Sequence, residues 1–298
     1  MCPFCGKEGT PCMEGLRFCP ACKVGFAHPA GSAGDYYPEY YGELGPFSRA
    51  LQERWLSAKR RRIESLVPRG RVLDFGCGSG AFLRVLQEAG WDVRGVEPME
   101  AARARLCAPL RGKVHPSLEA AEEEGLRFDA VTLWHSLEHV PDPGGALRRL
   151  GGLLRGGGAL YAAVPNFESL ERRIGGTQWF SLDIPRHRTH FTPEGLARAL
   201  SDAGFAVESV RQRAFTYDSF ALLQTLLNKA TGDRDFLYDE LKRGGSMRRS
   251  WSRFRRAGAW VRTLTAAPFI LPAALAAVPL LQALGISGSV EAAARKKP

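Results

Sequence analysis

An acid and three glycines near residue 74 are the residues whose types and spacing suggest chemistry most directly. Residues 72–80 read VLDFGCGSG, a short apolar strand that runs into glycines at alternate positions, and an amphipathic helix follows. Strand, glycine loop and helix in that order build a nucleotide pocket at the carboxyl end of a parallel strand. Asp74 stands two residues before the first glycine, where its charge would repel a pyrophosphate and attract an ammonium group. The pattern therefore differs from the G-x-G-x-x-G of dinucleotide sites.

Four histidines lie in two segments that could carry proton transfer. His135, Glu138 and His139 are spaced i, i+3 and i+4, which would place them on one face of a helical turn. His187 and His190 form the second pair. A histidine with a pKa near neutrality suits removal of a proton from a hydroxyl nucleophile, so each of the four is a candidate general base. The alternative is that Glu138 and His139 only hold their loop in place.

Four cysteines near the N-terminus form two C-x-x-C pairs, Cys2 with Cys5 and Cys19 with Cys22. Each pair can present two thiolates from a tight turn, and two such turns complete a closed tetrahedral zinc site. Residues 1–28 are too few for a self-sufficient core, so the metal would supply folding free energy. Four thiolates leave no open coordination position, which predicts a structural zinc. The alternative is a redox or disulfide pair.

Alternating strands and helices are expected to position these residues. We predict strands at residues 71–75, 92–96, 113–115, 128–134, 159–164 and 205–213. Helices are predicted between them, including one that begins with Thr192 as N-cap and Pro193 at its first position. This alternation predicts an α/β fold with a doubly wound parallel sheet.

Three motifs in this order resemble those of the class I S-adenosylmethionine-dependent methyltransferases. They are residues 72–80, residues 91–98 (WDVRGVEP) and residues 128–143 (FDAVTLWHSLEHVPDP), and the resemblance covers residues 67–213. It implies a Rossmann-like sheet whose last strand runs antiparallel, and residues 288–296 resemble that strand. If so, residues 214–287 form an insertion.

The resemblance also assigns cofactor contacts. Asp74 would attract the ammonium of S-adenosylmethionine, Glu97 would accept both ribose hydroxyls, and Trp134 would wall the methyl-transfer channel. Ser117 and Leu118 follow the third strand, where the family contacts adenine, but the family's usual acidic residue is missing there. The full set of implied cofactor residues is Asp74, Gly76, Gly78, Gly80, Glu97, Ser117, Leu118 and Trp134.

Residues 135–139 resemble the E-x-x-E-H segment of ubiquinone-pathway O-methyltransferases and small-RNA 2′-O-methyltransferases. That segment holds a divalent metal near the substrate. Here His135 replaces the first acid, which weakens the case for magnesium. A divalent metal at His135, Glu138 and His139 is therefore the less favoured alternative to a base. His187 or His190 would supply the remaining ligand or act as the base.

The predicted insertion is first basic and then apolar. Residues 242–262 hold eight basic residues and no acid, and residues 263–290 hold no charged residue. The apolar length could span a bilayer as a helix. Three prolines and the return to the sheet favour a re-entrant or interfacial hairpin instead. The arginines and tryptophans before it suit an anionic membrane surface. The alternatives are a packing or homodimer face and, less favoured, a nucleic-acid contact.

The whole chain then divides into five parts. We expect a zinc ribbon at residues 1–28, a linker and cap helix at 29–66, a cofactor-binding core at 67–213, the insertion at 214–287, and the last strand with a tail at 288–298. The chain has 298 residues, a formal net charge of +10 and seven cysteines, an odd number that fits a reducing cytoplasm.

Together these features predict a methyltransferase that uses S-adenosylmethionine and a structural Zn²⁺. The expected reaction is O-methylation of a small, sugar-linked or lipid-linked hydroxyl acceptor, in the cytoplasm or peripherally on the inner face of the membrane. One alternative is methylation of RNA or protein. The other, from a different class, is a non-catalytic scaffold protein that binds S-adenosylmethionine.

Overall fold

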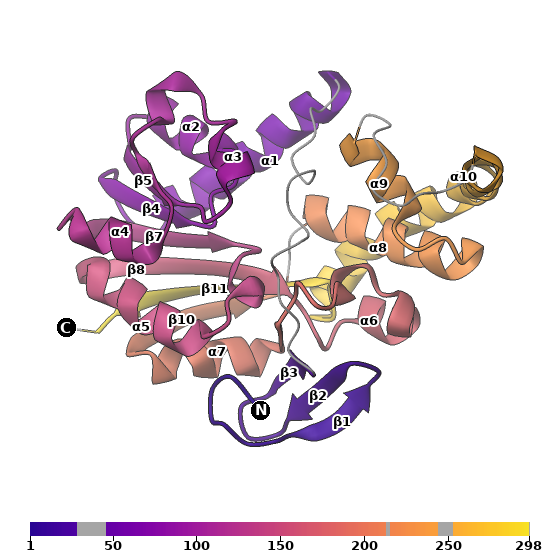
Figure 1. Cartoon of the computed structure of the whole chain (residues 1–298), viewed down its shortest axis with the longest axis horizontal. Helices are drawn as coiled ribbons and strands as arrows, with labels where there is room; N and C mark the ends of the chain where they lie inside the picture. Colours follow the sequence, from indigo (N-terminus) through magenta and orange to yellow (C-terminus); the bar gives the residue numbers. More distant parts are fainter. Residues whose placement is uncertain (29–45, 213–214, 244–252, 298) are drawn as a thin grey trace.

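A computed structural model describes residues 1–28, 46–212, 215–243 and 253–297 (Figure 1). The helix predicted at the end of the linker is present as α1 (Pro46–Glu64) and packs on α2 (Ala81–Glu88). Residues 29–45 of the predicted linker and cap lie outside the described residues.

The core is a seven-stranded sheet in the order β10-β11-β8-β7-β4-β5-β6. Its strands, in chain order, are β4 (Arg71–Phe75), β5 (Asp92–Val96), β6 (Val114–His115), β7 (Phe128–Trp134), β8 (Leu154–Pro165), β10 (Phe205–Arg211) and β11 (Ser289–Lys296). The four pairings among β4 to β8 are parallel, whereas β11 is antiparallel to both β8 and β10. The predicted doubly wound fold with an antiparallel last strand is confirmed.

Successive residues of each core strand face opposite sides of the sheet, because the side-chain period of a strand is two. Val72 and Leu73, for example, belong to two different apolar clusters. Helices cover both faces of the sheet (Figure 1). One face carries α1, α2 and α3 (Glu100–Arg103), and the other carries α4 (Leu118–Glu123), α5 (Pro143–Leu153) and α7 (Pro193–Asp202). The N-cap Thr192 accepts a hydrogen bond from Gly195 N at 2.9 Å, as its sequence signature predicts.

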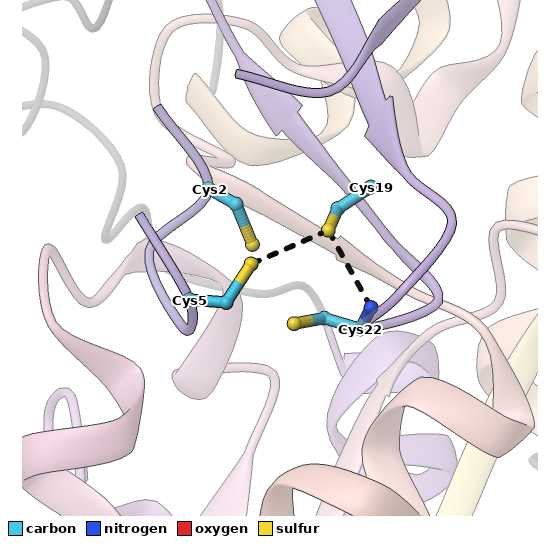
Figure 2. Close-up of side chains that lie close together, drawn as sticks. All are labelled: Cys2, Cys5, Cys19 and Cys22. Carbon is cyan, nitrogen blue, oxygen red and sulfur yellow. Dashed lines mark hydrogen bonds between the residues drawn. The ribbon is translucent and has the colours of Figure 1, made fainter. Parts of the chain in front are cut away.

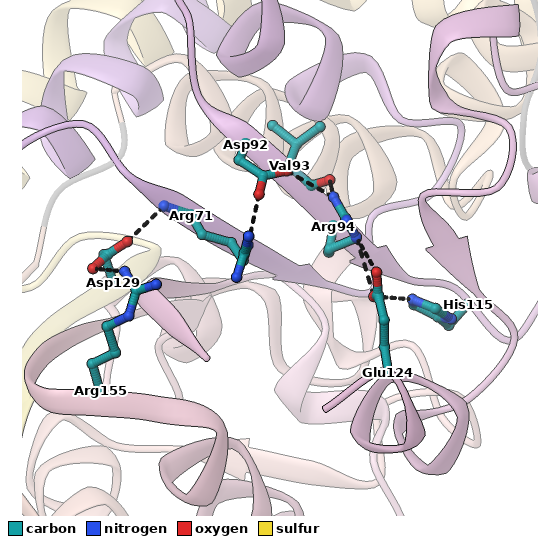
Figure 3. A network of polar contacts seen from close by, with 8 residues as sticks. All are labelled: Arg71, Asp92, Val93, Arg94, His115, Glu124, Asp129 and Arg155. Atoms are coloured by element: carbon teal, nitrogen blue, oxygen red, sulfur yellow. Dashed lines mark hydrogen bonds and ion pairs between the residues drawn. The ribbon is translucent and has the colours of Figure 1, made fainter. Parts of the chain in front are cut away.

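A row of ion pairs links neighbouring strands near their amino ends (Figure 3). Arg71 on β4 bonds Asp92 on β5 at 2.6 Å, and its backbone N–H donates to Asp129 on β7 at 2.6 Å. The row continues through Arg155, Arg94, Glu124 and His115. These contacts are partly exposed, so each stabilises little. The glycine loop and the histidine segments follow the carboxyl ends of the strands, which is the end where ligands bind in this kind of sheet.

A second, smaller sheet has the order β1-β2-β3-β9. Three of its strands come from the N-terminal unit: β1 (Thr10–Met13), β2 (Leu16–Cys19) and β3 (Val24–Ala27). The fourth, β9 (Thr189–Phe191), carries His190 of the second predicted histidine pair. The N-terminal unit is therefore joined to the core by the backbone pairing of β3 with β9. It lies below the main sheet in Figure 1.

The insertion folds as three helices, α8 (Phe215–Thr231), α9 (Phe236–Arg243) and α10 (Arg253–Ala283). The hairpin predicted within residues 263–287 is wrong, because α10 is one helix that contains Pro268, Pro272 and Pro279. The required return of the chain is made by α8 and α10 together. They run antiparallel, as the bonds from Gln282 to Asp218 and from Arg262 to Asp233 indicate.

Candidate functional site

The glycine loop after β4 lies against the segment after β7. Gly76, Gly78 and Gly80 have φ values of +77°, +58° and +76°, a backbone region that favours glycine. A Cβ on Gly76 would lie 2.5 Å from Cβ of Ser136, so only glycine permits this approach. Ser136 Oγ in turn donates to Phe75 O at 2.7 Å. The loop is therefore shaped by its close contact with Ser136.

Two buried carboxylates meet this loop. Asp74 accepts a hydrogen bond from Thr132 Oγ1 at 2.6 Å, and Glu97 accepts from Gly78 N at 2.8 Å and Met99 N at 2.9 Å. Burial raises the pKa of both groups, because it disfavours the charged form. The two predicted acids thus lie near each other beside the glycine loop, and a cationic ligand there would restore their charge.

Lys59 on α1 is a site residue that the sequence analysis missed. Its side chain is buried, and Nζ lies 3.6 Å from the centroid of the Trp55 ring and 4.5 Å from that of Trp134. Burial lowers the pKa of Lys59, and the negative charge of Asp74 opposes that shift. The spacing of Trp55 and Lys59, i and i+4 on a predicted helix, was the available signal. Helix α1 therefore brings a lysine close to Asp74.

Trp134 forms an aromatic wall beside this cation. Its ring lies 5.6 Å from that of Phe82 and 4.9 Å from that of Tyr161. The two residues predicted near adenine have structural contacts instead. Ser117 Oγ caps α4 by accepting from Ala120 N at 3.3 Å, and Leu118 packs in the core. Their side chains give no separate indication of an adenine site.

The second half of the site gathers Glu138, His139 and His187. One ligand atom of each lies within 4.8 Å of the others, and the two imidazole centroids are 4.7 Å apart. His139 Nδ1 bonds to Arg186 O at 3.1 Å and His187 Nδ1 to Ser181 O at 2.7 Å. Because a backbone carbonyl can only accept, both Nδ1 atoms carry the proton and both Nε2 atoms carry a lone pair.

Glu138 is the anion of this cluster. Its side chain is 1% exposed, and neither carboxylate oxygen has a hydrogen-bond partner in the part of the chain that the structure describes. Burial raises the pKa of Glu138, while the neighbouring His139 and His187 oppose the shift. A buried carboxylate without donors is costly unless something positive pairs with it. Two imidazole lone pairs and one such carboxylate form a donor set that suits a divalent cation.

The other two predicted histidines lie beside this cluster. His135 has a left-handed backbone with φ +52° and precedes the short turn Leu137–His139, so the predicted common helical face is wrong. Its Nδ1 lies 3.6 Å from Glu138 Oε1, and its ring stacks on Tyr217 at 4.0 Å. His190 is on β9, between the rings of Phe167 and Trp179. Of the predicted His135, Glu138 and His139 with His187 or His190, the structure therefore brings Glu138, His139 and His187 together.

All four histidines are held neutral. Burial lowers the pKa of His139 and His187 to about 4, and that of His135 and His190 to about 3. The sequence analysis expected a pKa near neutrality, which a solvent-exposed imidazole would have. Neutral imidazoles are good metal ligands, and each is a weak base on its own.

The four predicted zinc ligands lie together at one end of the small sheet (Figure 2). The sulfur atoms of Cys2, Cys5, Cys19 and Cys22 lie within 4.8 Å of one another. The backbone N–H of Cys22 donates to Cys19 Sγ at 3.4 Å, and the Lys7 backbone lowers the pKa of Cys5 to about 7. Such N–H contacts stabilise thiolates, which are the form that binds metal. The donor set and the two turns fit one tetrahedral zinc ion.

Comparison with known proteins gives a consistent picture. A family model described as a methyltransferase domain matches residues 47–210. The ubiquinone biosynthesis O-methyltransferase of Xanthomonas axonopodis pv. citri is 32% identical over 199 residues, which are 57% of this chain and 83% of that protein. The enzyme of the same name from Bordetella avium is 32% identical over 154 residues, which are 47% of this chain and 64% of that protein.

Solved structures agree on the fold. A putative sarcosine dimethylglycine methyltransferase from Galdieria sulphuraria aligns with a TM-score of 0.50 and 14% identity, over 87% of this chain and 93% of that chain. Coclaurine N-methyltransferase bound to N-methylheliamine and SAH aligns with a TM-score of 0.50 and 14% identity, over 86% and 76%. At this identity the likeness concerns the arrangement of the sheet and helices.

Proposed function

The chain belongs to the methyltransferase-domain family and is an S-adenosylmethionine-dependent methyltransferase, and from this premise we propose that it methylates an oxygen atom of a small hydroxyl compound. The observation that carries the cofactor assignment is the pair of buried carboxylates, Asp74 and Glu97, at the glycine loop. The support for oxygen as the acceptor is the similarity to O-methyltransferases together with the cluster of Glu138, His139 and His187.

The cofactor roles follow from charge. S-adenosylmethionine is zwitterionic at its methionyl end, and Asp74 with the nearby Lys59 offers one partner for each charge. Glu97 would accept the ribose hydroxyls, and the Trp134 ring would face the sulfonium, since aromatic faces attract cations. The methyl group then passes in line from sulfur to the acceptor oxygen, and the sulfonium becomes a neutral thioether. Alignment and exclusion of water are what the protein contributes to this step.

The acceptor hydroxyl must lose its proton, and the cluster of Glu138, His139 and His187 is the proposed receiver. His187 and His139 present Nε2 lone pairs there, and Glu138 supplies a compensating charge. The same atoms would hold a divalent cation, which when bound lowers the pKa of a coordinated hydroxyl. The carbonyls of Arg186 and Ser181 fix both imidazoles in the orientation that either role needs.

We also propose that Cys2, Cys5, Cys19 and Cys22 bind one structural zinc ion. The closeness of the four sulfur atoms and the N–H donation to Cys19 support it. Zinc analysis of the purified protein tests this directly. About one equivalent is expected, released when Cys19 is replaced by Ser, and a zinc-free native protein would refute it.

We further propose that this hydroxyl compound is lipid-linked, and the surface that would bring the enzyme to it is the apolar face of α10. By length and composition, Phe254–Ala283 is a helix that could cross a membrane, and 17% of its apolar window is buried. One side packs on α8 through Ala274, Val278 and Leu281. Large apolar side chains exposed on it include Phe254, Val261, Leu264, Phe269, Leu271, Leu275 and Leu280.

An anionic lipid surface matches this face better than a second copy does. The helix carries basic residues at its N-terminal end, and no charged residue follows from position 263 to 290. An uncharged apolar face with cations at one edge suits the boundary between acyl chains and anionic headgroups. The enzyme would then lie peripherally on the inner face of the cytoplasmic membrane.

Vesicle sedimentation tests this surface. Wild type should bind phosphatidylcholine vesicles that contain phosphatidylglycerol, and Phe269→Glu should weaken binding by about tenfold. Ile174→Glu, at an exposed apolar residue on α6 (Leu170–Gly175), is the matched control and should bind like wild type. If the protein ignores vesicles and sediments as a dimer that Phe269→Glu dissociates, the face binds a second copy and the lipid proposal fails.

Calorimetric titration tests the central proposal. Wild type should bind S-adenosylmethionine and S-adenosylhomocysteine but not NADH, and an acceptor screen should then detect S-adenosylhomocysteine formation with hydroxyl compounds. Cofactor binding without turnover on any hydroxyl compound, polymer or protein would favour the scaffold reading. A salt-sensitive shift with RNA would favour a polymer acceptor.

A further inference from the structure

The histidine cluster and the cysteine cluster are joined by a continuous path of backbone contacts. The knuckle Cys19–Cys22 leads through Lys23 into β3, and β3 pairs with β9. Gly25 lies opposite His190 in that pairing. The path continues past β9, because Ala27 N donates to Arg188 O at 2.9 Å and Arg188 N donates to Glu138 O at 2.8 Å.

The knuckle is also docked on the helix that follows β9. Thr192 Oγ1 donates to Lys23 O at 2.7 Å, and the Arg198 guanidinium donates to Ala21 O. A Cβ on Gly195 would lie 2.3 Å from Lys23 O, so the first turn of α7 touches the knuckle backbone directly. On the other side, Phe4 packs edge-on against Phe191 with centroids 6.0 Å apart. Both C-x-x-C turns therefore contact the segment 189–195.

The segment before β9 is also held locally, because His187 N donates to Asp183 O at 2.9 Å and Arg186 pairs with Asp183. It carries His187 and the Arg186 carbonyl that orients His139. Phe191 also receives a bond from Phe167 N at 2.8 Å, which ties β9 to the end of β8. A three-residue strand is too short to hold its own register, so its partner strand must fix it.

From these contacts we propose that the zinc ribbon is a positioning element of the histidine cluster. The four cysteines, when they hold zinc, fix the knuckle and β3. Strand β3 then fixes β9 and the register that brings His187 to Glu138 and His139. This inference rests on the proposed zinc site and on the proposed role of the histidines. It deepens both by making the ribbon part of the acceptor half of the enzyme.

The arrangement has a distinct consequence for the cofactor half. Asp74 and Glu97 are held by β4, β5 and the glycine loop, and Lys59 by α1, none of which pairs with the ribbon sheet. Loosening the ribbon should therefore disturb residues 186–191 and leave cofactor affinity unchanged. A purely stabilising ribbon would instead weaken both halves together.

Hydrogen exchange of the full-length protein, followed by mass spectrometry, tests this coupling. Removing zinc with a chelator should speed exchange in peptides that cover 186–191 by about tenfold or more. Peptides that cover 72–80 should change by less than about twofold. Affinity for S-adenosylhomocysteine, measured by calorimetry, should stay the same.

A glycine pair provides variants that leave every cysteine in place. Gly195→Ala forces a Cβ against Lys23 O, although alanine favours a helix more than glycine does. It should keep zinc and S-adenosylhomocysteine binding but raise exchange in 186–191 by about tenfold. Gly152→Ala, at a helix position whose Cβ would meet nothing within 4 Å, should leave all three measurements unchanged.

Several results would overturn the proposal. One is equal exchange of 186–191 with and without zinc, and another is Gly195→Ala behaving like Gly152→Ala. A native protein that contains no zinc would overturn it as well. If chelation unfolds the whole chain, so that 72–80 also exchanges, the zinc-loaded Gly195→Ala protein decides. Failure of wild type to bind S-adenosylhomocysteine would contradict the proposed function instead, and the exchange result would still stand by itself.

Discussion

The cofactor pocket and the histidine cluster are built in opposite ways. The cofactor site takes Asp74, the glycines and Glu97 from two neighbouring strands and the loop after the first of them, and only Lys59 comes from elsewhere. The cluster takes Glu138 and His139 from one turn and His187 from a segment held by the N-terminal sheet. A contiguous motif builds the first, whereas pairing between distant segments builds the second.

The two regions also differ in how burial acts on charge. In the pocket, the carboxylates face a lysine and the place of a cationic ligand. In the cluster, Glu138 faces imidazoles that burial keeps neutral. The pocket is thus prepared for a ligand that brings its own positive charge. The cluster needs a proton or a metal ion to balance its acid. Substitutions should therefore separate binding from transfer.

The largest effect is expected at Asp74. Asp74→Asn keeps the shape but removes the charge that faces the ammonium group, so affinity for S-adenosylmethionine should fall about a hundredfold, or about 3 kcal/mol. Calorimetric titration measures it. Asp92→Asn, in the ion-pair row at the amino ends of the strands, is the control and should bind normally. An unchanged affinity in Asp74→Asn would contradict the assignment of cofactor binding to Asp74 and its neighbours.

A somewhat smaller and different loss is expected in the cluster. Glu138→Gln and His187→Ala should each reduce turnover by about a hundredfold or less while the affinity for S-adenosylmethionine stays within about twofold. Single-turnover formation of S-adenosylhomocysteine, with an acceptor found by the screen, measures the transfer step. Equal losses of binding and turnover would mean that the cluster supports the fold and not the reaction.

A smaller loss of cofactor affinity is expected when Glu97 is replaced. Glu97→Gln retains an acceptor for one ribose hydroxyl but loses the charge-assisted bonds, so cofactor affinity should fall about tenfold. S-adenosylhomocysteine should lose as much affinity as S-adenosylmethionine, because the two share the ribose. A loss confined to S-adenosylmethionine would place Glu97 near the sulfonium and contradict the ribose assignment.

What the sequence could predict follows the same division. The doubly wound parallel sheet was predicted from local motifs and the antiparallel β11 from the family resemblance, and both are confirmed. Residues 186–191 could not be placed, because the partner of β9 lies far away at Val24–Phe26. The spacing of His135, Glu138 and His139 suggested a helical face, but the left-handed backbone at His135 breaks it.

The prediction of a hairpin in the apolar insertion was wrong because it also depended on a long-range contact. Its prolines argued against a continuous helix, yet α10 is continuous, because packing along α8 outweighs the three missing N–H donors. Lys59 was overlooked although its i, i+4 spacing from Trp55 was visible, because Trp134 and Asp74 come near it only through long-range contacts. Long-range contacts decide all of these cases, and a single sequence does not contain them in readable form.

The smallest expected effect is a dependence of ligand stabilisation on pH. Burial raises the pKa of Asp74 to about 6, above the ordinary value near 4. The protonated acid therefore favours the fold, and this contribution to stability is lost as pH rises through 6. S-adenosylmethionine needs the charged form, so its affinity should fall up to tenfold for each pH unit below 6.

Thermal unfolding with and without S-adenosylmethionine measures this dependence. The increase in Tm that the ligand gives should be large at pH 7.5 and small at pH 5. The imidazoles of His139 and His187 should contribute nothing to this change, because both stay neutral until about pH 4. The variant His187→Ala should therefore follow wild type, whereas Asp74→Asn should show a small increase in Tm at both pH values. A profile that changes near pH 6.5 and is lost in His187→Ala would instead place the titrating group in the histidine cluster and not at Asp74.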